Sequence, residues 1–255
     1  MSRYFLVLFV SVILYNFNPA FSQVSASDSA ISIPMFYVTY AYQFPGGDMA
    51  DRFGNNSSIG GGFQWKTTKN LIVGGEFLFL FGNNVKIADD IMFNLKTNDG
   101  DIISMSGNFT NYAIFERGYY ISGRIGKLIP VLSPNENSGF VVMGSLGYFQ
   151  HKIRIEVEKN TAPQLDGDYK KGYDRLAGGF SLSQFVGYMH IGDNRLLNFF
   201  GGVEIYEAWT KPKREVNFDT TKPDLITNRF DLLVGLKIGW LIPIFQRMPE
   251  KYYYY

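Results

Sequence analysis

The chain has 255 residues, with 24 basic and 23 acidic side chains and a net charge of +1. This balance provides neither a basic field for nucleic acid nor the charge excess typical of disordered chains. There is no cysteine and only two histidines, which excludes disulfides, thiolate catalysis and cysteine zinc sites and disfavours a histidine metal cluster. An aromatic content of 17% with 27 glycines favours strands over helices.

Residues 1–22 are predicted to be a secretory signal peptide. Arg3 supplies a positive charge, residues 4–15 are almost wholly apolar, and small residues within 20–22 precede a cleavage site at Gln23. The apolar run is shorter than the roughly 20 residues that a membrane-spanning helix needs. We therefore expect an exported protein whose mature chain begins with a periplasmic segment, residues 23–33.

Eight segments alternate between apolar and other residues with a period of two. In the first, Phe36 and Val38 share one face, and Tyr37 and Thr39 share the other. Each segment has about the 9–11 residues that a tilted strand needs to cross a membrane. The segments are residues 34–44, 58–66, 71–81, 119–129, 140–150, 177–188, 198–209 and 230–242.

The connections between these segments alternate between long and short. The short ones are rich in Pro, Asn, Gly or Asp, as expected of turns. This arrangement predicts an all-β fold, an eight-stranded antiparallel up-and-down transmembrane β-barrel over residues 34–245, with long extracellular loops and short periplasmic turns. A secreted lipocalin-like barrel, whose apolar face points inward, and other all-β folds are the alternatives.

The face opposite the apolar one is rich in glycine and carries charges near the middle of four segments. Glu76 and Arg124 lie on neighbouring segments, as do Glu204 and Lys237. Because a lone buried charge is costly, we expect two lumen ion pairs, Glu76–Arg124 and Glu204–Lys237. These pairs either fill and polarise the lumen or form a gate in which salt bridges exchange partners.

Aromatic residues are predicted to form two girdles at the membrane interfaces. Tyr42 and Phe44 lie toward the long-loop end of the predicted barrel, and Trp65 and Trp240 lie toward the short-turn end.

The stretch Tyr42–Gly54 (YQFPGGDMADRFG), followed by a glycine-rich segment and Lys66–Asn70 (KTTKN), is the most specific motif in the chain. On this pattern the chain resembles the OmpA-like or porin-like eight-stranded outer-membrane barrels of Bacteroidota. The resemblance implies a Gram-negative outer-membrane protein that stands alone or serves as an accessory subunit of a larger machine, such as barrel assembly or type nine secretion.

The chain ends in an aromatic tail, residues 246–255. Pro243 cannot donate to a β-ladder and is expected to end pairing, which sends the tail into the periplasm. The four tyrosines suit docking onto a partner; anchoring at the inner leaflet and a displaced assembly signal are the alternatives. They are Tyr252, Tyr253, Tyr254 and Tyr255.

No catalytic, cofactor or metal site is predicted. His151 and His190 fall at opposite ends of the barrel, and no spacing ties His151 to Ser104 or Glu156 as a hydrolase site would require. The basic run Lys211–Arg214 is either solvated loop surface or a contact for acidic lipopolysaccharide or a partner.

The long connection 82–118 is expected to extend the barrel as a hairpin. Its alternating stretches 91–95 and 102–105 flank Asp99-Gly100, a favourable hairpin turn. Residues 151–159 also alternate, so the fifth strand is expected to continue beyond the membrane.

The sequence thus predicts a non-enzymatic outer-membrane barrel that acts as a scaffold or accessory subunit of an outer-membrane complex. Outer-membrane lipid, lipopolysaccharide and outer-membrane or periplasmic proteins are the expected partners, with no nucleic acid and no cofactor. A free-standing barrel with a narrow gated solute path or a surface-binding role is the alternative, followed by a lipid-modifying enzyme.

Overall fold

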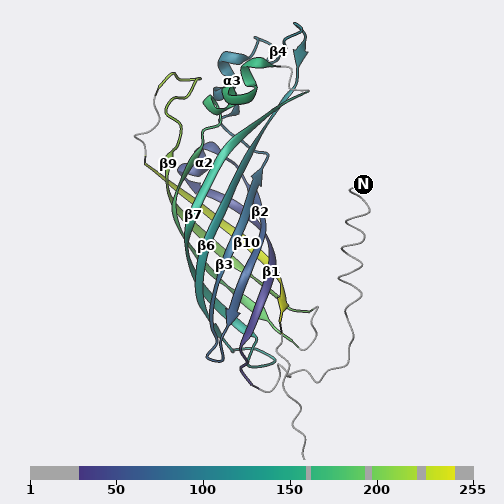
Figure 1. Cartoon of the computed structure of the whole chain (residues 1–255), viewed down its shortest axis with the longest axis vertical. Coiled ribbons are helices and arrows are strands. Elements are labelled where there is room, and N and C mark those ends of the chain that lie inside the picture. Colours follow the sequence, from purple (N-terminus) through teal and green to yellow (C-terminus); the bar gives the residue numbers. More distant parts are fainter. Residues whose placement is uncertain (1–28, 159–161, 193–196, 223–227, 245–255) are drawn as a thin grey trace, which may run out of the picture. The chain divides into compact units, whose positions relative to one another are not determined.

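The structure is a computed structural model that describes residues 29–158, 162–192, 197–222 and 228–244. Eight long strands close into one antiparallel barrel in the order β1-β10-β9-β8-β7-β6-β3-β2 (Figure 1). This confirms the predicted eight-stranded up-and-down barrel. The strands are β1 (Ile33–Gly47), β2 (Asn56–Lys66), β3 (Leu71–Gly82), β6 (Tyr112–Ile129), β7 (Gly139–Val157), β8 (Ala177–His190), β9 (Phe199–Pro212) and β10 (Arg229–Pro243).

The barrel is apolar on the outside. Along β1 the exposed side chains are Phe36, Val38, Tyr40 and others of the same parity, while Tyr37 is buried in the lumen. Phe36 is 53% exposed, the opposite of what a soluble barrel would do with a phenylalanine. The apolar face therefore points outward, and the lipocalin-like alternative is wrong.

Short turns close one end of the barrel, here called the turn end. Between β2 and β3, Asn70 adopts φ +60° and its backbone N–H donates to Thr67 at 2.9 Å. Lys66 donates to Ile31 O (3.1 Å) and to Asn137 Oδ1 (2.7 Å), which ties the start of the described chain to the β6–β7 turn. These bonds fasten the turn end of the lumen.

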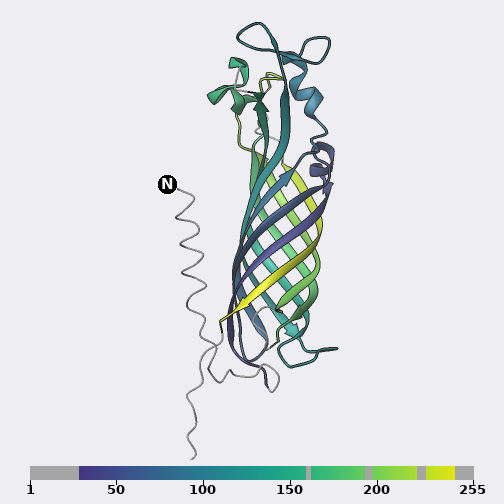
Figure 2. The same cartoon turned by 90° about the vertical axis from the view of Figure 1, so that its right-hand side faces the viewer.

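The other end, the loop end, carries the long connections and the short helices of the described residues (Figure 2). None of the helices in the described residues is long and apolar enough to cross a membrane. The short elements are α2 (Asp48–Arg52), α3 (Ala88–Met92), η1 (Phe93–Leu95), β4 (Ile102–Ile103), β5 (Phe109–Thr110), η3 (Pro163–Leu165) and η4 (Gly167–Gly172).

The predicted hairpin between 91–95 and 102–105 is wrong. Residues 91–95 lie in α3 and η1, and Ile102–Ile103 pairs instead with Phe109–Thr110. These residues form a helix rather than a strand because the helix buries both Ile91 and Met92 in the apolar cluster at the loop end. The extension of the fifth strand is confirmed, since β7 runs to Val157 and pairs there with Tyr112 of β6.

Several predicted boundaries lie outside the described residues, namely the signal peptide (1–22), most of the segment 23–33 and the tail 246–255. At the C-terminal end of the barrel, β10 ends at Pro243, as predicted from the lack of a backbone N–H in proline. Ile244 still donates its N–H to Pro34 O at 2.9 Å.

Candidate functional site: the lumen and the barrel wall

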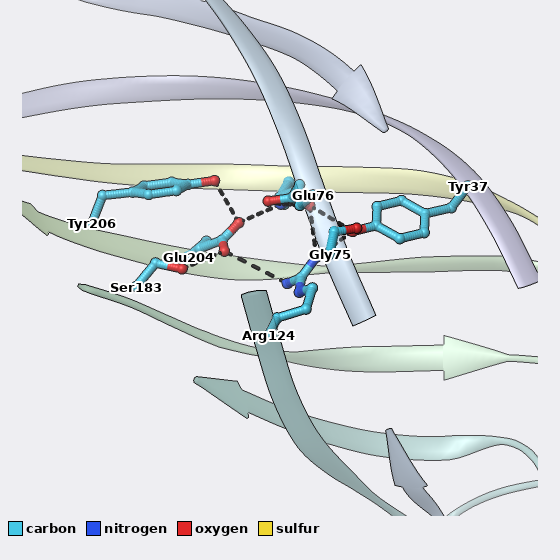
Figure 3. A network of polar contacts seen from close by, with 8 residues as sticks. Tyr37, Gly75, Glu76, Arg124, Ser183, Glu204 and Tyr206 are labelled. Atoms are coloured by element: carbon cyan, nitrogen blue, oxygen red, sulfur yellow. Dashed lines mark hydrogen bonds and ion pairs between the residues drawn. The ribbon is translucent and has the colours of Figure 1, made fainter. Parts of the chain in front are cut away.

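Four charged side chains from four strands meet inside the barrel, and Figure 3 labels three of them, Glu76, Arg124 and Glu204. Arg124 Nη1 of β6 lies 2.6 Å from Glu76 Oε2 of β3, and Lys237 Nζ of β10 lies 2.6 Å from Glu204 Oε2 of β9. All four side chains are fully buried. The structure thus brings together the members of both predicted pairs.

The two pairs form one network, which we call the lumen cluster (Glu76, Arg124, Glu204 and Lys237). Lys237 Nζ lies 2.8 and 2.7 Å from the two carboxylate oxygens of Glu76, and Arg124 Nη2 lies 3.6 Å from Glu204 Oε1. Two cations therefore face two carboxylates, and the cluster is neutral as a unit. A buried ion group is tolerated when it is paired in this way.

Hydroxyl groups saturate the remaining carboxylate positions. Tyr37 donates to Glu76 at 3.1 Å, Ser183 donates to Glu204 at 2.9 Å, and Tyr206 donates to Glu204 at 2.6 Å (Figure 3). Hydrogen bonds to charged acceptors in a low-dielectric site are strong, so these contacts stabilise this arrangement of the cluster.

Glycine on the lumen face makes room for these long side chains. A Cβ added to Gly62 would lie 2.0 Å from Gly75 O and 2.8 Å from the Tyr37 hydroxyl. Any larger residue would displace either the neighbouring strand or the ring that donates to the cluster. The glycine-rich strands are thus explained by crowding in a narrow lumen.

Apolar layers lie on both sides of the lumen cluster. Toward the turn end, Phe200 packs edge-to-face against Tyr37 and Phe185, each at 5.7 Å between ring centroids. Toward the loop end, Tyr120 packs against Tyr206 at 5.2 Å. Buried side chains therefore fill the lumen above and below the charges.

The loop end of the lumen is closed by α2. Met49 and Phe53 are buried in the apolar cluster at the mouth, and the guanidinium of Arg52 forms an ion pair with Asp231 of β10. Asp231 also accepts from Thr210 at 2.6 Å and lies 3.0 Å from His151 Nε2. This mouth cluster (Arg52, His151, Thr210 and Asp231) pins the first long loop over the barrel.

Sequence reasoning missed the mouth cluster, although a signal was present. Asp231 has the lumen-facing parity of Lys237 in β10, and Thr210 has that of Glu204 in β9. The pairing of Asp231 with Arg52 had no sequence signal, because Arg52 lies in a loop 179 residues away.

The histidines are placed as the sequence indicated. His151 lies buried near the mouth, in ring contact with Phe53 and Phe149, and His190 ends β8 at the turn end. The carboxylate beside His151 is Asp231 rather than Glu156. Among the described residues, no three His, Asp or Glu side chains are grouped to hold a metal ion.

The four predicted girdle residues all point outward and are between 41% and 52% exposed. Tyr42 and Phe44 lie at the loop end of β1, and the rings of these two side chains pack edge-to-face at 5.3 Å. Trp65 and Trp240 lie toward the turn end, and the indole N–H of Trp65 donates to Ser32 at 2.7 Å.

Two polar side chains interrupt the apolar wall on neighbouring strands. Gln184 of β8 and Glu207 of β9 both point outward, and the register (Leu182 with Glu207, Gln184 with Ile205) makes them diagonal neighbours. Next to Gln184 is a shallow groove of about 570 Å³ lined by Gly123 and Gly144. A Cβ atom added to either glycine would have no other atom within 4 Å. We call these four residues the wall patch.

The predicted docking tail, Tyr252–Tyr255, lies outside the described residues.

Comparison with known proteins returns structures but no family. No family model matches the chain, and no curated protein matches its sequence. The chain is similar to the attachment invasion locus protein Ail of Yersinia pestis, at 11% identity over 83% of this chain and 99% of that chain, with a TM-score of 0.42. It is also similar to neisserial surface protein A (10%, 81% and 96%, TM-score 0.38) and to outer membrane protein OprG from Pseudomonas aeruginosa (10%, 86% and 99%, TM-score 0.36). Similarity at sequence identities this low describes the fold alone. The predicted resemblance to barrels of Bacteroidota in particular remains a prediction.

Proposed function

We propose that the chain is an integral outer-membrane barrel that conducts no solute and serves as a scaffold or accessory subunit of an outer-membrane protein complex. The outward apolar face supports membrane insertion, because a closed barrel satisfies its backbone hydrogen bonds internally and can face lipid. The filled lumen supports a role without transport.

The predicted signal peptide, residues 1–22, supports export to the outer membrane. With the described chain entering and leaving at the turn end, that end would face the periplasm and the long loops would face outside. The tail 246–255 would then be periplasmic.

The wall patch is the observation that carries the scaffold role. An outward carboxylate or amide in a lipid-facing wall loses its hydration unless a partner supplies hydrogen bonds or an opposite charge. Glu207 forms no ion pair with a described residue. Gln184 is exposed beside the Gly123–Gly144 groove, where a side chain of a second membrane protein would fit. A partner with a basic or amide group at this depth would satisfy both residues.

The test is purification from the native outer membrane in mild detergent, with mass spectrometry of all co-migrating proteins. We expect a stoichiometric partner with the parent chain and its loss with the double variant Gln184→Leu/Glu207→Leu. Leucine is favourable toward lipid, so the variant itself should fold normally. Ile59→Leu in β2, on the far side of the barrel, is the matched control and should retain the partner. A lone, heat-modifiable monomer in every preparation would overturn the scaffold role.

The tail provides an independent arm of the same experiment. A protein truncated after Phe245 should lose a periplasmic partner if Tyr252–Tyr255 dock it. Retention of every partner after truncation would assign the tail to interfacial anchoring or assembly instead.

A gated solute path and a lipid-modifying enzyme are less well supported. Opening a path would require moving the fully buried lumen cluster and the aromatic layers on both sides of it. A hydrolase would require His151 to reach a substrate, yet its ring is fully buried.

A further inference from the structure

A basic groove lies on the outer surface of the barrel near the loop end. It has a volume of about 810 Å³ and lies between the outward face of the β6–β7 ribbon and η4. Six of its lining side chains are basic and two are acidic, in a chain whose net charge is only +1. The basic residues are Arg117, Lys152, Arg154, Lys170, Lys171 and Arg214.

Three of the six cations form ion pairs with carboxylates. Arg214 donates to both oxygens of Asp174 (2.9 and 2.5 Å), and this hydrogen bonding raises the pKa of its guanidinium, which keeps it charged. Arg154 lies 2.7 Å from Glu156, and Lys171 lies 2.5 Å from Asp168. The Arg154 and Lys171 pairs are exposed to solvent, whereas the two-pronged contact of Arg214 with Asp174 is partly buried.

The other three cations form no ion pair within the described chain. Lys152 and Lys170 form no ion pair there, and Arg117 donates only to backbone carbonyls, at 2.7 Å for Glu116 O. The Arg117 guanidinium stacks on the Phe115 ring at 4.7 Å, which orients it without neutralising it. Arg117 and Lys152 are directly opposite each other across the β6–β7 ladder. Two like charges in such positions repel unless an anion lies between them.

The groove begins where the apolar belt ends. Its lining includes Phe79, which is 42% exposed and pairs across the ladder with Tyr119. Tyr119 is in ring contact with Tyr148 at 6.3 Å, and the next outward residues toward the loop end are Arg117 on β6 and Gln150 then Lys152 on β7. Along the outer surface, the aromatic side chains are thus followed directly, toward the loop end, by basic side chains.

We propose that this groove binds the phosphate groups of a phosphorylated glycolipid in the outer leaflet, with an acyl chain against Phe79. The inference rests on the proposed membrane insertion, which places the end of the apolar belt at the level of lipid headgroups. Arginine and lysine both bind phosphate, and an arginine fork does so with two parallel hydrogen bonds. Phosphate would also relieve the repulsion between Arg117 and Lys152.

The test uses the full chain folded in phosphatidylcholine vesicles that contain lipid A with two phosphates, or the same lipid A after phosphatase treatment. After detergent extraction, bound lipid is counted by native mass spectrometry. We expect the parent protein to retain the phosphorylated lipid at least tenfold better than the dephosphorylated one. The variant Lys152→Gln/Lys170→Gln should lose most of this preference. Lys127→Gln, which removes an exposed cation at the turn end of β6, should keep it.

Competition separates the sources of phosphate and the classes of polyanion. Failure of excess inorganic phosphate to displace the lipid supports a glycolipid site, because the acyl contact adds affinity. Displacement by inorganic phosphate alone, equal retention of both lipids, or tighter binding of a sulfated polysaccharide than of lipid A would overturn the proposal. Protease protection and heat-modifiability in the same vesicles report insertion separately, so a failure of membrane insertion is distinguishable from a failure of lipid binding.

Discussion

Replacing Lys237 by methionine should destabilise the barrel strongly. The ammonium group lies within 2.8 Å of three carboxylate oxygens, two on Glu76 and one on Glu204. Methionine has a similar length and no charge, so the variant converts a neutral buried cluster into one with two carboxylates and a single cation, Arg124. Removing one partner from a buried ion pair typically costs about 3–5 kcal/mol, and we expect a loss in that range.

A second substitution should restore part of the lost stability. In Lys237→Met/Glu204→Gln, Arg124 and Glu76 remain as a matched pair at 2.6 Å, and the amide of glutamine can still hydrogen-bond Ser183 and Tyr206. The double variant should therefore be less destabilised than the sum of the two single variants by at least about 2 kcal/mol.

The free energy of unfolding is to be measured by urea titration in detergent micelles or vesicles, following the fluorescence of the three tryptophans. The parent chain, both single variants and the double variant form the cycle. A Lys237→Met variant as stable as the parent, or strictly additive effects around the cycle, would refute the view that the four charges act as one unit.

Three further predictions follow from the lumen and its mouth. Glu76→Gln should leave single-channel conductance in planar bilayers at background, because side chains fill the lumen on both sides of it; ion currents with this variant would revive the gated path. Asp231→Asn weakens the ion pair with Arg52, so amide hydrogen exchange across α2 should accelerate at least tenfold while the strands stay protected. Unchanged exchange in α2 would contradict the view that the mouth cluster pins this helix over the barrel. Gly62→Ala should cost about 1–3 kcal/mol in the same urea assay, because its Cβ would meet Gly75 O at 2.0 Å. Gly123→Ala, with open space before its Cα, is the matched control and should change the unfolding free energy by less than about 0.5 kcal/mol.

The sequence by itself determined the strands, their order and their inward and outward faces. A period of two assigns every second residue to the same face, so the outward position of Phe36 and the inward position of Glu76 were both readable from local pattern. The two expected ion pairs were accessible for the same reason, since consecutive antiparallel strands are neighbours and their mid-strand residues fall at similar heights.

Tertiary structure alone decided which residues meet across the lumen and over its mouth. Lys237 bonds Glu76 across 161 positions of sequence because closing the ring sets the barrel diameter and stagger, which depend jointly on the register of all eight strand pairs. The ion pair between Arg52 and Asp231 likewise depends on tertiary structure, namely on the position of α2 over the mouth of the closed barrel.

Packing also decided the short loop segments. The five residues 91–95 are too few for their apolar pattern to separate a strand from a helix. They became helical because α3 lets Ile91 and Met92 enter the apolar cluster at the loop end together, whereas a strand would turn one of them outward. Local alternation thus determined the strands of the barrel and their two faces. Burial against strands distant in sequence determined the contacts in the lumen and the short helices at the loop end.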